Sequence, residues 1–157
     1  MSIERVREYL KQWEADMRIQ EFPVSSATVE LAAAALQCEP GRIAKTLSFA
    51  AYERTLLIVA AGDARVNNGK FKKEFGVKAK MLSAEQVEEC TGFRVGGVCP
   101  FAAKPGAEVF LDQSLKRFQT VFPACGSSNS AIEVSLEELE EFSRAAGWVD
   151  VCAVREE

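Results

Sequence analysis

Two β-rich runs separated by a short turn constrain the fold more than any other feature of this sequence. Residues 46–50 and 55–61 carry strand-forming and small apolar side chains, and the turn Tyr52-Glu53-Arg54 joins them. Two such runs with so short a connection predict a β-hairpin. Because 157 residues suit one core of ordinary size, we expect a single domain over residues 1–157.

Helix and strand signals are interspersed around this hairpin, with no repeat and no linker. Apolar side chains recur every three or four positions over residues 3–17, which predicts an amphipathic helix. Ser25 and Ser26 are expected to cap a helix over 28–36, and two capping boxes open helices near Ser83 and Ser135. Such a mixture predicts an α+β fold, with a mixed and curved sheet flanked by helices. Further elements are a helix at 67–75, a loop at 91–106, and strands at 77–81, 109–112, 120–124, 131–134 and 148–154.

The sequence contains no histidine. This excludes Ser-His-Asp and Cys-His catalysis, HExxH metalloproteases and histidine-ligated zinc deaminases. Any chemistry must therefore use lysine, carboxylates, thiols, hydroxyls, backbone amides or groups of the substrate itself.

The cysteines indicate a reducing compartment, and the lengths of the apolar runs bear on membrane insertion. Five cysteines are scattered without a CxxC pair, which favours free thiols over a zinc knuckle or a redox pair. No apolar run is long enough to span a bilayer, and the N-terminus does not resemble a signal peptide. We expect a cytoplasmic protein without metal, cofactor or membrane partner.

Charge is unevenly distributed on a chain whose net charge is −4. The C-terminal part is acidic, whereas residues 65–80 are basic with only Glu74 opposing. A local basic stripe can contact a phosphate backbone, but a solvated helix face has the same composition, and both interpretations stay open. The basic residues are Arg65, Lys70, Lys72, Lys73, Lys78 and Lys80.

Three segments at element boundaries are candidates for chemistry. In the first, Lys45 stands where a short helical turn runs into a strand, either as a solvated lysine or as a fixed cation at a pocket. The second, residues 95–101, contains Gly96-Gly97, which forms either a plain turn or an oxyanion-binding nest. Cys99 in the same segment has no evident base, so a packed side chain is the simpler interpretation. The third, residues 126–130, is a polar loop with several donors and acceptors.

Taken together and in this order, these segments resemble the YbaK/prolyl-tRNA editing family. The resemblance runs through GRIAKTLSF (41–49), GDARVNNGKFKKEFG (62–76), VGGVCPFA (95–102) and CGSSNSAIEVSLEEL (125–139). It implies an α+β domain around a mixed, partly barrel-like sheet. It also implies hydrolysis of mischarged aminoacyl-tRNA in trans, commonly tRNA-Pro carrying a small noncognate amino acid, with prolyl-tRNA synthetase as a candidate partner and no role for DNA.

The resemblance also assigns site residues. Lys45 matches the family's pocket lysine, and Gly96 and Gly97 match the glycines that line the aminoacyl site. Substrate contacts are expected from Cys99, Pro100, Gly126, Ser127 and Asn129. The candidates for tRNA contacts come instead from the basic charge of residues 65–80, and they are Arg65, Lys70, Lys72 and Lys73. The chain departs from the family at Cys99, where many members have serine, and at Ala102, where many have glycine.

The expected mechanism needs no histidine. The backbone N–H groups of Gly96 and Gly97 would bind the carbonyl oxygen, and Lys45 would orient the terminal phosphate or aminoacyl group through its charge. The resemblance implies that a ribose hydroxyl or side-chain thiol of the substrate assists. Two alternatives remain: a binding module that kept the pocket without turnover, and a thiol enzyme using Cys99 or Cys125.

Overall fold

The computed structural model describes residues 2–154. Within this range the helices are α1 (Ser2–Leu10), α2 (Val29–Leu36), α3 (Asn68–Phe75), α4 (Ala84–Thr91) and α5 (Leu136–Ser143). Short 3₁₀ turns are η1 (Lys11–Trp13), η2 (Asp16–Arg18), η3 (Pro40–Arg42) and η4 (Gln113–Arg117). The strands are β1 (Gln20–Glu21), β2 (Ile43–Ala51), β3 (Arg54–Ala61), β4 (Ala64–Val66), β5 (Ala107–Asp112), β6 (Thr120–Pro123), β7 (Ser130–Ala131), β8 (Val134–Ser135), β9 (Gly147–Val149) and β10 (Cys152–Val154).

The predicted hairpin is confirmed and forms the centre of the sheet. β2 and β3 pair antiparallel over all of β3, from Ala44 with Ala61 to Ala51 with Arg54. Their two-residue loop places Tyr52 (φ 50°) and Glu53 (φ 66°) in the left-handed region. Two successive left-handed residues match the twist of the flanking strands, which explains why this turn closes the hairpin tightly.

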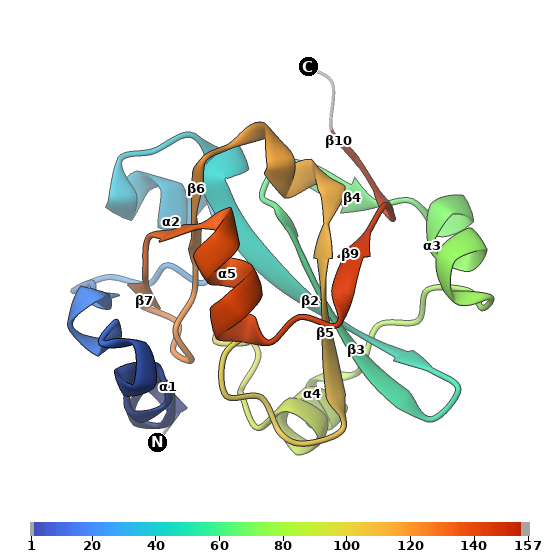
Figure 1. Ribbon diagram of the computed structural model, residues 1–157, viewed down its shortest axis with the longest axis horizontal. Coiled ribbons are helices and arrows are strands. Elements are labelled where there is room, and N and C mark those ends of the chain that lie inside the picture. The colour runs from blue at the N-terminus through green and yellow to red at the C-terminus, as the bar shows by residue number, and fades with distance from the viewer. Residues whose placement is uncertain (1, 155–157) are drawn as a thin grey trace.

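The other strands extend the hairpin into a curled, mixed sheet of six strands in the order β8-β6-β2-β3-β5-β9. β6 joins β2 in parallel, β5 joins β3 in parallel, and β9 joins β5 in parallel, while β8 pairs antiparallel with β6. Two short ribbons, β1-β7 and β10-β4, lie outside this sheet. Figure 1 shows the hairpin at the centre, α2 and α5 on one side of it and α3 on the other. The predicted α+β fold with a partly barrel-like sheet is therefore confirmed.

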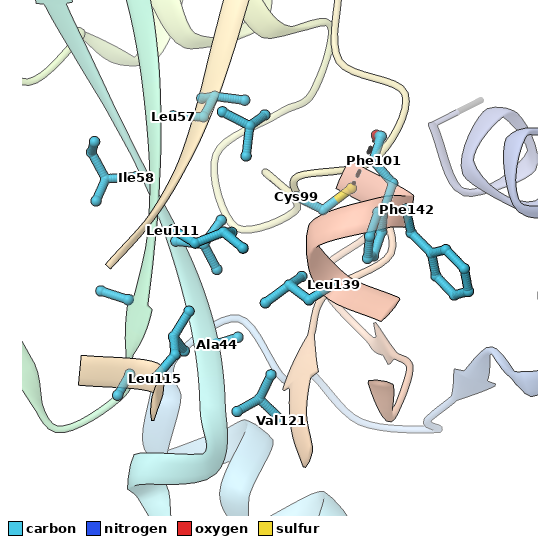
Figure 2. Packing of buried hydrophobic residues seen from close by; sticks show 14 of the residues in the cluster. Ala44, Leu57, Ile58, Cys99, Phe101, Leu111, Leu115, Val121, Leu139 and Phe142 are labelled. Atoms are coloured by element: carbon cyan, nitrogen blue, oxygen red, sulfur yellow. Dashed lines mark hydrogen bonds between the residues drawn. The ribbon is translucent and has the colours of Figure 1, made fainter. Parts of the chain in front are cut away.

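The main core lies between the sheet and α5. Leu139 and Phe142 of α5 face Leu57 of β3 and Leu111 of β5, and all four are almost completely buried (Figure 2). A smaller apolar cluster packs α2 against Ile43 and the end of β6. The small cluster matters for function because it fixes α2 beside the first half of β2.

Several predicted element boundaries are wrong. The first helix ends at Leu10 rather than at residue 17, and the chain continues in 3₁₀ turns around Glu14, which has a positive φ. Thr28, not Ser25 or Ser26, caps α2 by accepting the Leu31 N–H. The strand expected at 77–81 is reduced to one bridge, between Met81 and Phe49.

The last predicted strand, residues 148–154, is split between two sheets. The Val151 N–H donates to the buried carboxylate of Asp112 (2.9 Å), which interrupts strand pairing at that point. β9 therefore stays beside β5, and β10 crosses to β4.

Candidate functional site

A cavity of about 430 Å³ opens between the middle of β2, α2 and the loop at residues 95–98. This volume is within the range of small-molecule sites. Most of its wall is apolar, with Val29, Ile43, Leu47 and Val98 among the lining side chains. Such a site suits a small organic group held by a few fixed polar contacts.

Three segments far apart in the sequence meet at the mouth of the cavity. The Ser26 N–H donates to the Ser128 carbonyl (2.6 Å), which joins the chain before α2 to the loop at 126–130. A β-carbon on Gly96 would lie 3.4 Å from the Ala27 β-carbon, so the loop at 95–98 packs against the same segment. These contacts make the mouth a single packed unit.

Lys45 lies on β2 in the wall of the cavity. Its ammonium group donates to the carbonyl of Gly62 (3.4 Å) and to that of Ala64, both just beyond β3. Burial of this half-buried side chain lowers the pKa of Lys45, an effect that Cys152 partly opposes. The structure thus holds Lys45 as a positioned cation rather than as a freely solvated side chain.

Gly96 and Gly97 have different surroundings. Gly96 lines the cavity and has a φ of +91°, a conformation that favours glycine. The Gly97 N–H donates to the Arg94 carbonyl (2.9 Å), which closes a turn. Because that donor is already used, the expected pairing of both N–H groups with a carbonyl oxygen has to be corrected: Gly97 acts through packing.

The packing partner of Gly97 is the predicted third segment. A β-carbon at position 97 would lie 3.0 Å from the Gly126 carbonyl oxygen and 3.2 Å from the Ser127 α-carbon. The structure therefore brings the Gly-Gly loop and the polar loop into direct backbone contact.

Ser127 and Asn129 stabilise the polar loop, and the cavity wall is formed by their neighbour Ser130. The Ser127 hydroxyl lies 2.6 Å from the Ser130 hydroxyl and donates to the Asn129 side-chain carbonyl (3.0 Å). The Asn129 amide donates to the Phe22 carbonyl (2.9 Å). These bonds position the mouth of the cavity, and the substrate contact expected for Ser127 and Asn129 stays a prediction.

Cys99 and Pro100 lie away from the cavity. Cys99 is fully buried in the main core, where its thiol donates to the Phe101 carbonyl (3.4 Å; Figure 2), and burial raises the pKa of Cys99 to about 12. Pro100 lines a separate hollow beside Tyr9. The chain turns inward after Val98, so this placement does not favour the substrate contact expected of the two residues.

Sequence reasoning missed Thr46 and Ser48, which also line the cavity. The Thr46 hydroxyl is buried and has no hydrogen-bond partner among residues 2–154. The available signal was that Thr46 and Ser48 are polar residues two apart on one strand, because residues two apart share a face of a strand. Within the same range no three histidine, cysteine or acidic side chains gather into a metal site.

The basic residues divide into two groups. Lys70 at the start of α3 is tied down, with its ammonium donating to the Asp150 carboxylate (3.1 Å) and the Cys152 carbonyl (3.0 Å). Arg65, Lys72 and Lys73 are exposed and form no ion pair within the described part of the chain.

The exposed basic surface continues from α3 toward the cavity. Lys78 and Lys80 are also exposed, and the Lys80 carbonyl pairs with Ala50 of β2 (2.9 Å). The next residue, Met81, lines the cavity. We call Arg65, Lys72, Lys73, Lys78 and Lys80 the basic track. No helix between residues 2 and 154 is long and apolar enough to cross a membrane.

Comparison with known proteins identifies the family. Residues 24–142 match the model of the aminoacyl-tRNA editing domain. The uncharacterized protein YwhH of Bacillus subtilis is 54% identical over 97% of this chain and 98% of its own length. A proline--tRNA ligase of Bacillus cytotoxicus is 24% identical over 96% of this chain, which spans 27% of that ligase.

Solved structures agree with this result. A protein proposed to be a trans-editing enzyme for prolyl-tRNA synthetase superposes with a TM-score of 0.87 at 28% identity, with 97% of each chain covered. Together with the match over most of the sequence, this similarity shows that the chain belongs to the aminoacyl-tRNA editing domain family.

Proposed function

We propose that this protein hydrolyses the ester bond of mischarged aminoacyl-tRNA in trans. The observation that carries the proposal is the cavity of about 430 Å³ with Lys45 in its wall, a lysine whose ammonium group is fixed by the carbonyls of Gly62 and Ala64. Family membership and the similarity to a proposed trans-editing enzyme support it. The substrate that we favour is tRNA-Pro carrying a small noncognate amino acid, and the reaction would take place in the cytoplasm.

The chemistry asks little of the protein because an aminoacyl ester is already activated. The oxygen of a water molecule attacks the ester carbonyl carbon, the bond from that carbon to the ribose oxygen breaks, and a proton of the water passes to the ribose oxygen. We assign to Gly96 a backbone donor for the carbonyl oxygen, and to Lys45 the orientation of the terminal phosphate or aminoacyl group. A neighbouring ribose hydroxyl would relay the proton in place of a histidine.

The basic track would bind the acceptor arm of the tRNA. It runs from β4 and α3 to a point beside Met81 at the cavity, so phosphates following it would bring the charged 3′ end to the pocket. Phosphate contacts of this kind release counterions and make binding depend steeply on salt. Prolyl-tRNA synthetase remains a candidate partner that would hand over the tRNA.

The main test is a deacylation time course on tRNA-Pro charged separately with alanine, cysteine, serine or proline. We expect rapid loss of one noncognate residue with proline spared, and a loss of about 100-fold or more in the Lys45→Ala variant. Lys11→Ala is the matched control, because Lys11 is exposed and its ion pair among residues 2–154 is with Glu8 alone. Wild-type turnover in Lys45→Ala would refute the role of the lysine.

The basic track is tested separately by reversing Lys72 and Lys73 to glutamate. Binding of tRNA should weaken, and the slope of log affinity against log salt should fall by about 0.9 for each lost phosphate contact. Hydrolysis of a minimal aminoacyl-adenosine should not change. Reversal of Lys104 and Lys116, exposed lysines outside the track, is the control; equal effects of both pairs would move the binding face elsewhere.

The thiol-enzyme alternative loses support from the surroundings of both candidate cysteines. Burial raises the pKa of Cys99 and that of Cys125, and each side chain is inaccessible to solvent. A protonated, enclosed thiol is a poor nucleophile. The binding-module alternative is decided by the time course: ligand-induced stabilisation with no turnover on any charged tRNA would establish it.

A further inference from the structure

The edge of β2 that faces away from β3 is covered at both ends but not in the middle. At one end Ala44 pairs with Pro123 of β6. At the other end the Ala50 N–H donates to the Lys80 carbonyl (2.9 Å), and the Leu82 N–H donates to the Ser48 carbonyl (3.1 Å). Thr46 lies between the two covered stretches.

The backbone of Thr46 points into this gap. Along a strand, successive residues direct their N–H and C=O groups to opposite edges. The bonds made by Ser48 and Ala50 show that the even-numbered residues of β2 direct these groups away from β3. Thr46 therefore does the same, and none of the strand pairings or hydrogen bonds of residues 2–154 gives its N–H or C=O a partner on that edge.

The gap opens onto the cavity. Thr46 lines the cavity together with Ala124, which follows β6, and Leu82, which ends the other covering segment. A backbone N–H and C=O without protein partners in the middle of a strand are uncommon, because backbone polar groups are usually satisfied by hydrogen bonds. The N–H and C=O of one residue, both without a partner beside a cavity, therefore form a feature to which a ligand can bind.

The length of the gap limits what can fill it. Pairing with β6 stops at Ala44, and pairing with the segment at 80–82 resumes at the Ser48 carbonyl, so within residues 2–154 the gap comprises the N–H and C=O of Thr46 and the N–H of Ser48. An added peptide strand needs several consecutive open positions. A single amino-acid unit needs one.

We propose that the α-aminoacyl group of the substrate pairs with Thr46 as a residue of a neighbouring antiparallel strand would. The Thr46 N–H donates to the ester carbonyl oxygen, and the α-ammonium group of the amino acid donates to the Thr46 carbonyl. Directly opposed residues in an antiparallel pair exchange two hydrogen bonds in the same way. The inference rests on the proposed function and adds to it a requirement for a free α-amino group.

This pairing also supplies a second donor for the carbonyl oxygen. The Gly97 N–H is used by the turn to Arg94, so Gly96 would otherwise act alone. Donors from Thr46 and Gly96 come from different walls of the cavity. Two fixed donors from different directions suit the oxyanion that develops during attack on the ester.

The test uses amide analogues that cannot be hydrolysed and uniformly ¹⁵N-labelled wild-type protein. The probes are 3′-deoxy-3′-(L-alanylamino)adenosine and its propionylamino counterpart, which lacks only the α-amino group. We expect the alanyl probe to shift the Thr46 amide proton downfield and to slow its exchange with solvent. The propionyl probe should bind about 10- to 100-fold more weakly, the effect of losing one hydrogen bond from a charged donor. Leu47, whose N–H faces β3, provides the internal reference amide.

The outcomes separate this inference from the proposed function. Equal affinity for both probes, saturable binding without a response at Thr46, or no binding of the alanyl probe would each overturn the pairing. A Thr46 response in a protein that deacylates no charged tRNA would keep the pairing and refute the hydrolysis. Deacylation without a Thr46 response would do the reverse.

Discussion

Gly97→Ala should separate the two loops that form the mouth of the cavity. The added β-carbon would lie 3.0 Å from the Gly126 carbonyl oxygen and 3.1 Å from its carbonyl carbon, whereas ordinary contact begins near 3.4 Å. The loops must therefore move apart by about 0.4 Å, the difference between 3.4 and 3.0 Å. Because the obstructing atoms belong to the backbone, no side-chain rotation can relieve the contact.

The expected cost follows from this geometry. Overpacking of a tight site typically costs about 1–3 kcal/mol, and we expect the free energy of unfolding to fall by that amount in chemical denaturation. Deacylation by the folded variant should fall by about tenfold or more, since small misplacements of binding groups reduce rates strongly.

Gly147→Ala is the matched control for this prediction. A β-carbon at position 147 would meet nothing within 4 Å, and the residue has no positive φ. We expect its stability to remain within about 0.5 kcal/mol of the wild type. If Gly97→Ala were as stable and as active as Gly147→Ala, the close contact between the loops would not be a real constraint.

Three further predictions test individual side chains. Because burial lowers the pKa of Lys45, its ammonium should lose its proton at a lower pH than exposed lysines in an NMR titration; an equal or higher midpoint would contradict the buried position. Thr46→Val removes a buried hydroxyl without a partner and should raise the free energy of unfolding by about 1 kcal/mol. Thr120→Val removes a hydroxyl that is bonded to Arg42 and Glu133, and it should lower the free energy of unfolding. Ala102→Gly should stabilise the protein by about 0.5–1 kcal/mol in denaturant titrations, because Ala102 has a φ of +56°; a loss of stability would refute strain there.

The sequence predicts those parts of the fold that depend on neighbouring residues. The hairpin β2–β3 and the capping boxes at Ser83 and Ser135 form as expected, because each depends on side chains a few positions apart. The split between β9 and β10 could not be foreseen, because it depends on Asp112 accepting the Val151 N–H from far along the chain.

The candidate site shows the same division. Lys45 and Gly96 do lie at the cavity, but periodicity could not show that the chain turns after Val98 and takes Cys99 into the core. The gap at Thr46 has no sequence signature at all. It exists because two unrelated segments cover β2 on either side and neither reaches the middle.

The pairing of β10 with β4 has a consequence for how the chain folds during synthesis. Val154 pairs with Ala64, roughly 90 residues earlier, and at ordinary ribosomal rates those residues take about 5–20 s to be made. The β2–β3 hairpin can form within microseconds, so the edge of β4 waits unpaired for most of that time. Nascent chains that stall before β10 is made would therefore expose a strand edge and an incompletely anchored α3, which makes them natural targets for chaperones and proteases.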